Sequence, residues 1–199
     1  MARRAATCWL LLCAAFAVLS LLVAVLPSDR LDWRPTHLAA EPWRVVTAAF
    51  VHLSLTHLAA NLAGCAVLAL LGWRADLGRR DVAAALAALP LTQLGLLLRP
   101  DLLRYAGLSG VLHALVAIAV LTLLTRRGRD PLIGAAIAAG LLLKLVTEHP
   151  LGPALRPTPG FDFAVAPFAH LSGVMAGVAG WGLVRLWAAL AAHRRLNSA

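Results

Sequence analysis

Six apolar stretches separated by short polar connections make up most of this chain. Each stretch is close to the roughly 20 residues that an α-helix needs to cross about 30 Å of hydrocarbon. The pattern therefore predicts an all-α membrane protein, a single domain over residues 1–199 with six transmembrane helices. The predicted helices span residues 5–26, 55–72, 82–98, 108–125, 131–149 and 164–190.

The composition supports a membrane protein and argues against several other classes. Hydrophobic residues make up 61% of the chain and charged residues only 14%, with a mean hydropathy of +0.81, as expected for an integral membrane protein. The three cysteines lie in apolar stretches without metal-ligand spacing, so we expect buried thiols, no metal and no cofactor. The net charge of +9 is spread over several loops, which argues against nucleic-acid binding.

Arginines in the connections predict how the chain is oriented in the membrane. The side richer in arginine is normally cytoplasmic, so both termini are expected in the cytoplasm as short tails. The first apolar run exceeds the roughly 7–15 residues of a signal peptide, so we expect a retained helix. The eleven arginines of the cytoplasmic side are Arg3, Arg4, Arg74, Arg79, Arg80, Arg126, Arg127, Arg129, Arg185, Arg194 and Arg195, and the six of the outer side are Arg30, Arg34, Arg44, Arg99, Arg104 and Arg156.

The connection before the second predicted helix has features of the outer membrane surface. Ser54 is a candidate N-cap for a helix that begins at Leu55. Residues 41–53 would then form an interfacial loop, and Trp33 and Trp43 suit the aromatic belt at the lipid headgroups.

Four polar residues stand at similar depth in three different apolar stretches. With the predicted orientation, His57, Asn61, Ser109 and His170 all lie in the outer half of the bilayer. A serine hydroxyl becomes a nucleophile when a neighbouring base removes its proton, and His170 is the candidate base. Because the second, fourth and sixth stretches contain no Asp or Glu, we expect a Ser–His dyad. His57 and Asn61, at i and i+4 on one helix face, are candidate oxyanion donors together with the Ser109 backbone N–H.

Small residues flank the candidate nucleophile and base. Gly107 and Gly110 surround Ser109, and Gly173 and Gly177 follow His170 at a spacing that lets membrane helices approach closely. Taken singly, each feature has a simpler interpretation, since a membrane serine often bonds its own helix and GxxxG is frequent in such helices. The combination of residue types, order and depth favours an intramembrane serine protease.

These residues resemble the rhomboid family of intramembrane serine proteases over roughly residues 43–181. The matching motifs are Trp43-Arg44, His52-x4-His57-x3-Asn61, Gly107-Leu108-Ser109-Gly110 and Ala169-His170-x2-Gly173-x3-Gly177. The resemblance implies a six-helix rhomboid-like bundle, with Ser109 as nucleophile, His170 as general base, and His57 and Asn61 at the oxyanion hole. His113 stands where rhomboids often have a tyrosine packed on the catalytic histidine. A histidine could stack similarly, but it adds a titratable group, and the sequence leaves its role open.

The run from Tyr105 to His113 and the pair Lys144 and Glu148 look closest to the bacterial rhombosortase branch. This resemblance implies a multi-pass protein of the bacterial inner membrane whose site opens to the periplasmic side. Its substrates would be membrane-anchored proteins with C-terminal Gly-Gly sorting tails. Two interpretations of Lys144 and Glu148 are open: an i, i+4 pair that neutralises itself near a helix end, which is the simpler one, or a role in binding the substrate.

Other classes fit the sequence less well. A rhomboid-like protein that binds membrane clients without cutting them is the main alternative, although such proteins normally lack the serine or the histidine. A metalloprotease would show His-Glu-x-x-His, which is absent. A small transporter would not explain a matched nucleophile and base, and no internal repeat supports it. The sequence leaves the oligomeric state open.

Overall fold

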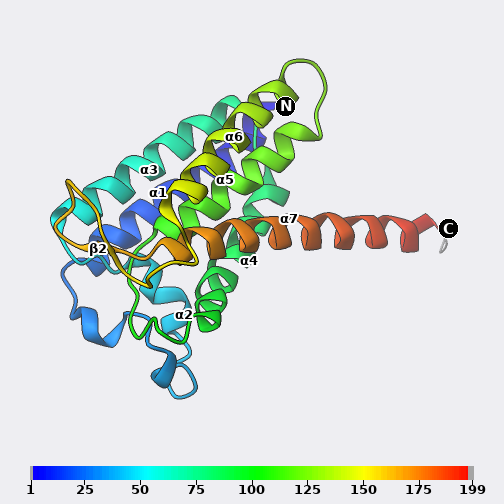
Figure 1. The fold of residues 1–199 in the computed structure, drawn as a ribbon. Helices are drawn as coiled ribbons and strands as arrows, with labels where there is room; N and C mark the ends of the chain where they lie inside the picture. Colours follow the sequence, from blue (N-terminus) through cyan, green and yellow to red (C-terminus); the bar gives the residue numbers. More distant parts are fainter. Residues whose placement is uncertain (1, 197–199) are drawn as a thin grey trace.

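The computed structural model describes residues 2–196, and over that range it is an all-α bundle with one short hairpin (Figure 1). Short 3-10 turns over Ser28–Arg30, Pro35–His37, Ala48–Phe50 and Leu96–Leu98 join or extend the helices. The α-helices are α1 (Ala2–Val23), α2 (Arg44–Thr47), α3 (Leu55–Arg74), α4 (Arg79–Gly95), α5 (Ser109–Leu124), α6 (Asp130–Glu148) and α7 (Pro167–Leu196), and the hairpin strands are β1 (Arg156–Pro157) and β2 (Ala164–Val165).

Five of the helices are long and apolar enough to cross a membrane: α1, α3, α4 with its 3-10 extension, α6 and α7. The remaining predicted span, α5, has 16 residues and therefore reaches roughly 24 Å. Most of its residues are buried by neighbouring helices, so it needs no full-length lipid-facing surface. The all-α membrane architecture predicted from the sequence is confirmed. The side chains of Arg3 and Arg4, two of the arginines used to predict orientation, lie outside the described residues.

Helix α5 is the centre of the bundle and packs against α3, α4, α6 and α7. Small side chains such as Ala114 and Ala119 are fully buried on it, which allows the close helix packing typical of membrane proteins. At the end of the bundle away from Ser109, Thr122 donates to Asp81 at 2.7 Å and Arg185 donates to the same carboxylate at 3.0 Å. These bonds join α4, α5 and α7 at that end.

The segment between α1 and α3 folds back onto the protein. Trp33 has no exposed surface and packs in a second core with Leu96, Leu102 and Phe168. The prediction that Trp33 lies in the headgroup belt is therefore wrong, because its large ring fills a protein interior, whereas Trp43 is half exposed.

Asp32 is the fully buried carboxylate that organises this segment. It accepts hydrogen bonds from Arg44 at 2.8 Å and from Arg34 at 3.0 Å, and it also pairs with Arg104 from the loop before α5. Buried charges need such partners, since an unpaired one would be very costly. The network therefore ties the first loop to the loop that precedes Ser109.

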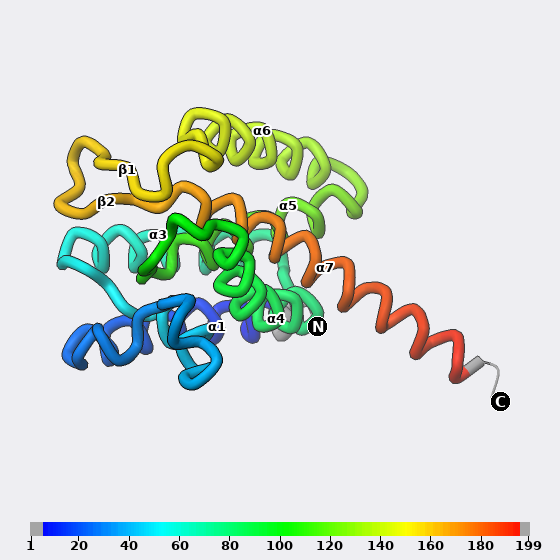
Figure 2. The backbone as a smooth tube through the Cα atoms, turned by 60° about the horizontal axis from the view of Figure 1, so that its bottom comes forward, coloured from blue at the N-terminus to red at the C-terminus, as the bar shows by residue number. Residues whose placement is uncertain are grey.

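Between α6 and α7 the chain forms the hairpin of β1 and β2 (Figure 2), and residues of this hairpin line the same cavity as Ser109. Arg156 pairs with Val165, and Pro157 with Ala164, in antiparallel register. The sixth predicted span was placed too early, because residues 164 and 165 pair as a strand and α7 begins only at Pro167. The C-terminal half of α7 runs out past the other helices in both views.

Candidate active site

Ser109 is the first residue of α5 and follows a tight turn. Gly107 has a φ of +127°, a conformation that side chains disfavour. Its N–H donates to the Ala48 carbonyl at 2.9 Å, which anchors the turn to the first loop. The turn leaves Ser109 at the N-terminal end of a helix, where backbone N–H groups are free of intrahelical partners.

Tyr105 stabilises the same turn through its hydroxyl group. Its hydroxyl donates to the Gly107 carbonyl at 3.0 Å and accepts from the Gly110 N–H at 3.4 Å. The backbone of Tyr105 pairs with that of Trp33 in an isolated antiparallel bridge. Burial raises the pKa of the Tyr105 hydroxyl, so it stays protonated and continues to donate.

Glycines bring the backbones of α5 and α7 together near Ser109. A Cβ on Gly110 would lie 2.8 Å from the Ala169 carbonyl oxygen. A Cβ on Gly173 would overlap the Gly110 carbonyl, and one on Gly177 would overlap that of Ala114. The close approach predicted from the small-residue spacing is therefore present.

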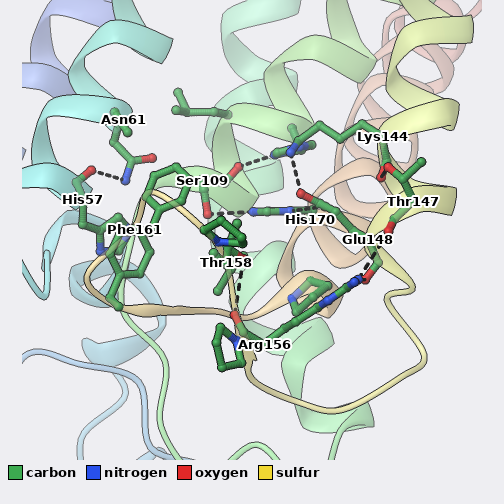
Figure 3. Close-up of a pocket in the computed structure, with 18 residues that line it drawn as sticks. His57, Asn61, Ser109, Lys144, Thr147, Glu148, Arg156, Thr158, Phe161 and His170 are labelled. Carbon is green, nitrogen blue, oxygen red and sulfur yellow. Dashed lines mark hydrogen bonds and ion pairs between the residues drawn. The ribbon is translucent and has the colours of Figure 1, made fainter.

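The side chains of Ser109 and His170 meet across this contact (Figure 3). Ser109 Oγ lies 3.1 Å from His170 Nε2. His170 is one turn into α7 and only 4% exposed, while Ser109 is partly open to a cavity of about 470 Å³. A hydroxyl and an imidazole at this separation can share the proton, which is the geometry needed to activate a serine.

The opposite ring nitrogen of His170 contacts a carboxylate that was not predicted to be part of the site. Glu148 Oε2 lies 2.6 Å from His170 Nδ1, and Glu148 Oε1 lies 2.5 Å from Lys144 Nζ. The expectation of a histidine without a carboxylate partner is therefore wrong, because Glu148 comes from α6, a different helix from those that carry His57, Ser109 and His170. Lys144 and Glu148 do form the expected pair, but that pair uses just one carboxylate oxygen.

His113 stacks on His170, with ring centroids 4.1 Å apart and planes 14° from parallel. Its Nδ1 lies 2.7 Å from the Ser109 carbonyl oxygen, which can only accept, so Nδ1 carries the proton. The ring of His113 therefore packs on His170 in the way that the sequence left open. Within residues 2–196, no three His, Cys, Asp or Glu side chains are grouped as metal ligands.

His57 and Asn61 line the same cavity as Ser109, from α3. The Leu53 N–H donates to His57 Nδ1 at 3.3 Å, so a neutral His57 carries its proton on Nε2. A Cβ on Gly107 would lie 2.6 Å from that Nε2, which places the ring edge beside the turn. Asn61 Nδ2 donates to the carbonyl of His57, its own helix backbone, at 3.0 Å.

The start of α3 and the hairpin close one side of the cavity. The Ser54 side chain caps α3 by accepting from the His57 N–H at 3.1 Å, which confirms the predicted N-cap. Ser54 also donates to Asp162 at 2.7 Å, and the Phe163 ring stacks on His57 at 4.1 Å. These hairpin contacts join residues about a hundred positions apart, and no local sequence signal predicted them.

A smaller cavity of about 150 Å³ also adjoins Ser109, and His57 lines it as well. Apolar side chains line most of it, including Leu53, Ala106 and Ala164. Ser109 thus lines both the larger cavity and the smaller, more apolar one.

Sequence comparison agrees with this architecture. The family described as Rhomboid domain matches residues 39–186, a range that contains every residue of the site described above. No curated protein matches the chain. Because the match covers well over half of the sequence, the chain belongs to the rhomboid family of intramembrane proteases.

Proposed function

We propose that this protein is an intramembrane serine endopeptidase in which Ser109 is the nucleophile and His170 the general base. The observation that carries the proposal is the 3.1 Å separation of Ser109 Oγ and His170 Nε2 beside an open cavity. The family match supports the same class of reaction.

The reaction would proceed by acyl transfer. His170 Nε2 takes the hydroxyl proton as Ser109 Oγ bonds to the scissile carbonyl carbon, and the imidazolium then gives that proton to the leaving amine as the C–N bond breaks. Water, deprotonated by the same nitrogen, attacks the acyl-enzyme and releases Ser109. The cavity of about 470 Å³ offers a place for that water.

The developing oxyanion would be stabilised from the turn and from α3. The Ser109 backbone N–H, His57 Nε2–H and Asn61 Nδ2–H are the donors in this proposal. Asn61 bonds its own helix carbonyl in the present structure, so it would rotate toward the substrate when the carbonyl becomes charged. Losing one such donor typically costs about 3–4 kcal/mol of transition-state stabilisation.

The substrate would be a membrane-anchored protein that enters from the lipid. Residues of α3 and α6 both line the large cavity, and α6 is largely unburied by the rest of the bundle. We therefore place the entry path between these two helices. A segment of small or helix-breaking residues would unwind most readily and fit the small apolar cavity beside Ser109.

The cellular setting is part of the same proposal. The excess of arginine at the end of the bundle away from Ser109 favours cytoplasmic termini and a site that opens to the periplasmic side of a bacterial inner membrane. The run from Tyr105 to His113 supports the rhombosortase branch, and with it C-terminal Gly-Gly sorting tails as substrates.

Labelling of the purified protein by a fluorophosphonate probe tests the proposal without a known substrate. Wild type should be labelled, whereas Ser109→Ala and His170→Ala should not. Ser20→Ala is the matched control, because Ser20 is fully buried in α1 and lines neither cavity. Equal labelling of wild type and Ser109→Ala would contradict the proposal and favour a rhomboid-like protein that binds membrane clients without cutting them.

A further inference from the structure

Glu148, the last residue of α6, reaches the catalytic pair from the side opposite Ser109. Its carboxylate lies 2.6 Å from His170 Nδ1, while Ser109 Oγ lies 3.1 Å from Nε2, so the three side chains form one line of contacts (Figure 3). The Glu148 side chain is 21% exposed and that of His170 only 6%. The contact is therefore largely shielded from water, where a charge-assisted hydrogen bond is strongest.

The contact decides which nitrogen of His170 holds the proton. An ionised carboxylate can only accept, so Nδ1–H must donate to Glu148 and the lone pair of Nε2 must face the Ser109 hydroxyl. That is the tautomer a general base needs. The other tautomer would put a proton on Nε2 and leave the base unable to accept from Ser109.

The position of Glu148 is unfavourable locally and is supported by neighbouring cations. A carboxylate at the C-terminal end of a helix faces the negative end of the helix dipole. Lys144 offsets this by donating to Glu148 Oε1 at 2.5 Å, and Arg156 of β1 donates to the terminal carbonyls of Thr147 and Glu148 at 3.3 and 3.2 Å. Local rules broken at such a cost are typical of functional sites.

We propose that Glu148 is a positioning residue that holds His170 in the reactive tautomer and stabilises the imidazolium formed when Ser109 attacks. This rests on the proposed function. Glu148 stays ionised throughout, and the proton moves only between Ser109, His170 and the leaving amine. Lys144 supports the carboxylate, so the Lys144–Glu148 pair serves His170 and is more than a self-neutralising pair on α6.

Fluorophosphonate inactivation kinetics of the full-length protein distinguish a Glu148 that positions His170 from a Glu148 that only neutralises Lys144. Glu148→Gln keeps the shape but loses the charge, so we expect the maximal inactivation rate to fall about tenfold to hundredfold while the probe concentration at half-maximal rate stays unchanged. If neutralising Lys144 were the only role of Glu148, the double variant Lys144→Gln/Glu148→Gln would recover toward wild type. If Glu148 positions His170, the double variant stays as slow as Glu148→Gln.

Asp130→Asn is the matched control, because Asp130 is a carboxylate on the same helix that also pairs at i, i+4, with Arg126, and lies outside the cavity. It should be inactivated at the wild-type rate.

A second test uses the wild-type protein alone. The proton on His170 Nδ1 should give a low-field resonance in the NMR spectrum of ¹⁵N-histidine-labelled protein. The absence of that resonance, or wild-type kinetics in Glu148→Gln, would overturn the proposal. Unchanged kinetics in Glu148→Gln while Ser109→Ala is inert would leave the protease function standing, whereas an unreactive wild type would remove both.

Discussion

Replacing Gly173 by alanine tests the helix contact that brings Ser109 to His170. The added Cβ would overlap the carbonyl oxygen of Gly110 on α5. Because packed interiors leave no void for a methyl group, α5 and α7 would have to separate by roughly 1 Å at this point. His170 is three residues earlier on the same helix, so it would move with Gly173.

Two effects of this separation can be estimated. Overpacking of a tight interior typically costs about 1–3 kcal/mol of stability. The Ser109–His170 distance of 3.1 Å would exceed the roughly 3.5 Å beyond which a hydrogen bond is lost. A misplacement of about 1 Å costs about a hundredfold in rate. We therefore expect Gly173→Ala to lower both the unfolding temperature and, by about two orders of magnitude, the rate of fluorophosphonate labelling.

Gly182→Ala is the control, because Gly182 lies on the same helix and a Cβ there would meet nothing within 4 Å. The general preference of helices for alanine over glycine, about 1 kcal/mol, should leave this variant as stable as wild type or slightly more so. Both variants are compared by thermal unfolding in detergent and by labelling rate. Equal behaviour of the two would refute the argument that the α5–α7 contact sets the geometry of the site.

Two further predictions concern the loops around the site. Tyr105→Phe removes the hydroxyl that bonds Gly107 and Gly110, so the unfolding free energy should fall by about 1–3 kcal/mol and labelling should slow; unchanged values in both measurements would count against this role. Burial lowers the pKa of His52, whose Nδ1 lies 3.0 Å from the Phe50 carbonyl oxygen. The folded protein therefore binds a proton on His52 more weakly than the unfolded chain does. The contribution of the neutral His52 to the stability of the fold is complete above pH ~6.5, the unfolded pKa. It is lost as the pH falls from there through the lower folded pKa. His52→Asn keeps a donor for that carbonyl without titrating, and its unfolding temperature should fall less than that of wild type between about pH 7.5 and 5.5. Equal losses in both proteins would contradict the assignment.

The helices and the central pair of the site could be read from the sequence because their signals are local. Apolar runs predict membrane helices, and Ser54 marks the start of α3 by a capping bond that spans three residues. Ser109 and His170 could be paired from the sequence because both stand near the N-terminal ends of their helices with glycines beside them. Those glycines set how closely the helices approach, so their spacing carries tertiary information.

The contact between Glu148 and His170 could not be predicted in this way. The contact of Glu148 with Lys144 spans one turn of the same helix and was expected. Its contact with His170 joins α6 to α7, two helices that the chain connects through the hairpin. The path of that connection depends on pairing between Arg156 and Val165 and on the bond from Ser54 to Asp162. None of these has a local pattern, so the position of the hairpin could not be inferred from the sequence.

The sequence by itself determined the class of protein, most of the helix positions, and the serine and histidine that the fold brings together, because hydropathy, capping and helical spacing act over a few residues. Only the tertiary structure decided which groups face each other: it buried Trp33 inside the protein, set Gly110 against α7, and placed a carboxylate on the far side of His170. The physical reason is that each of these contacts depends on how separate helices and loops pack, and packing is settled by the shape of the whole chain.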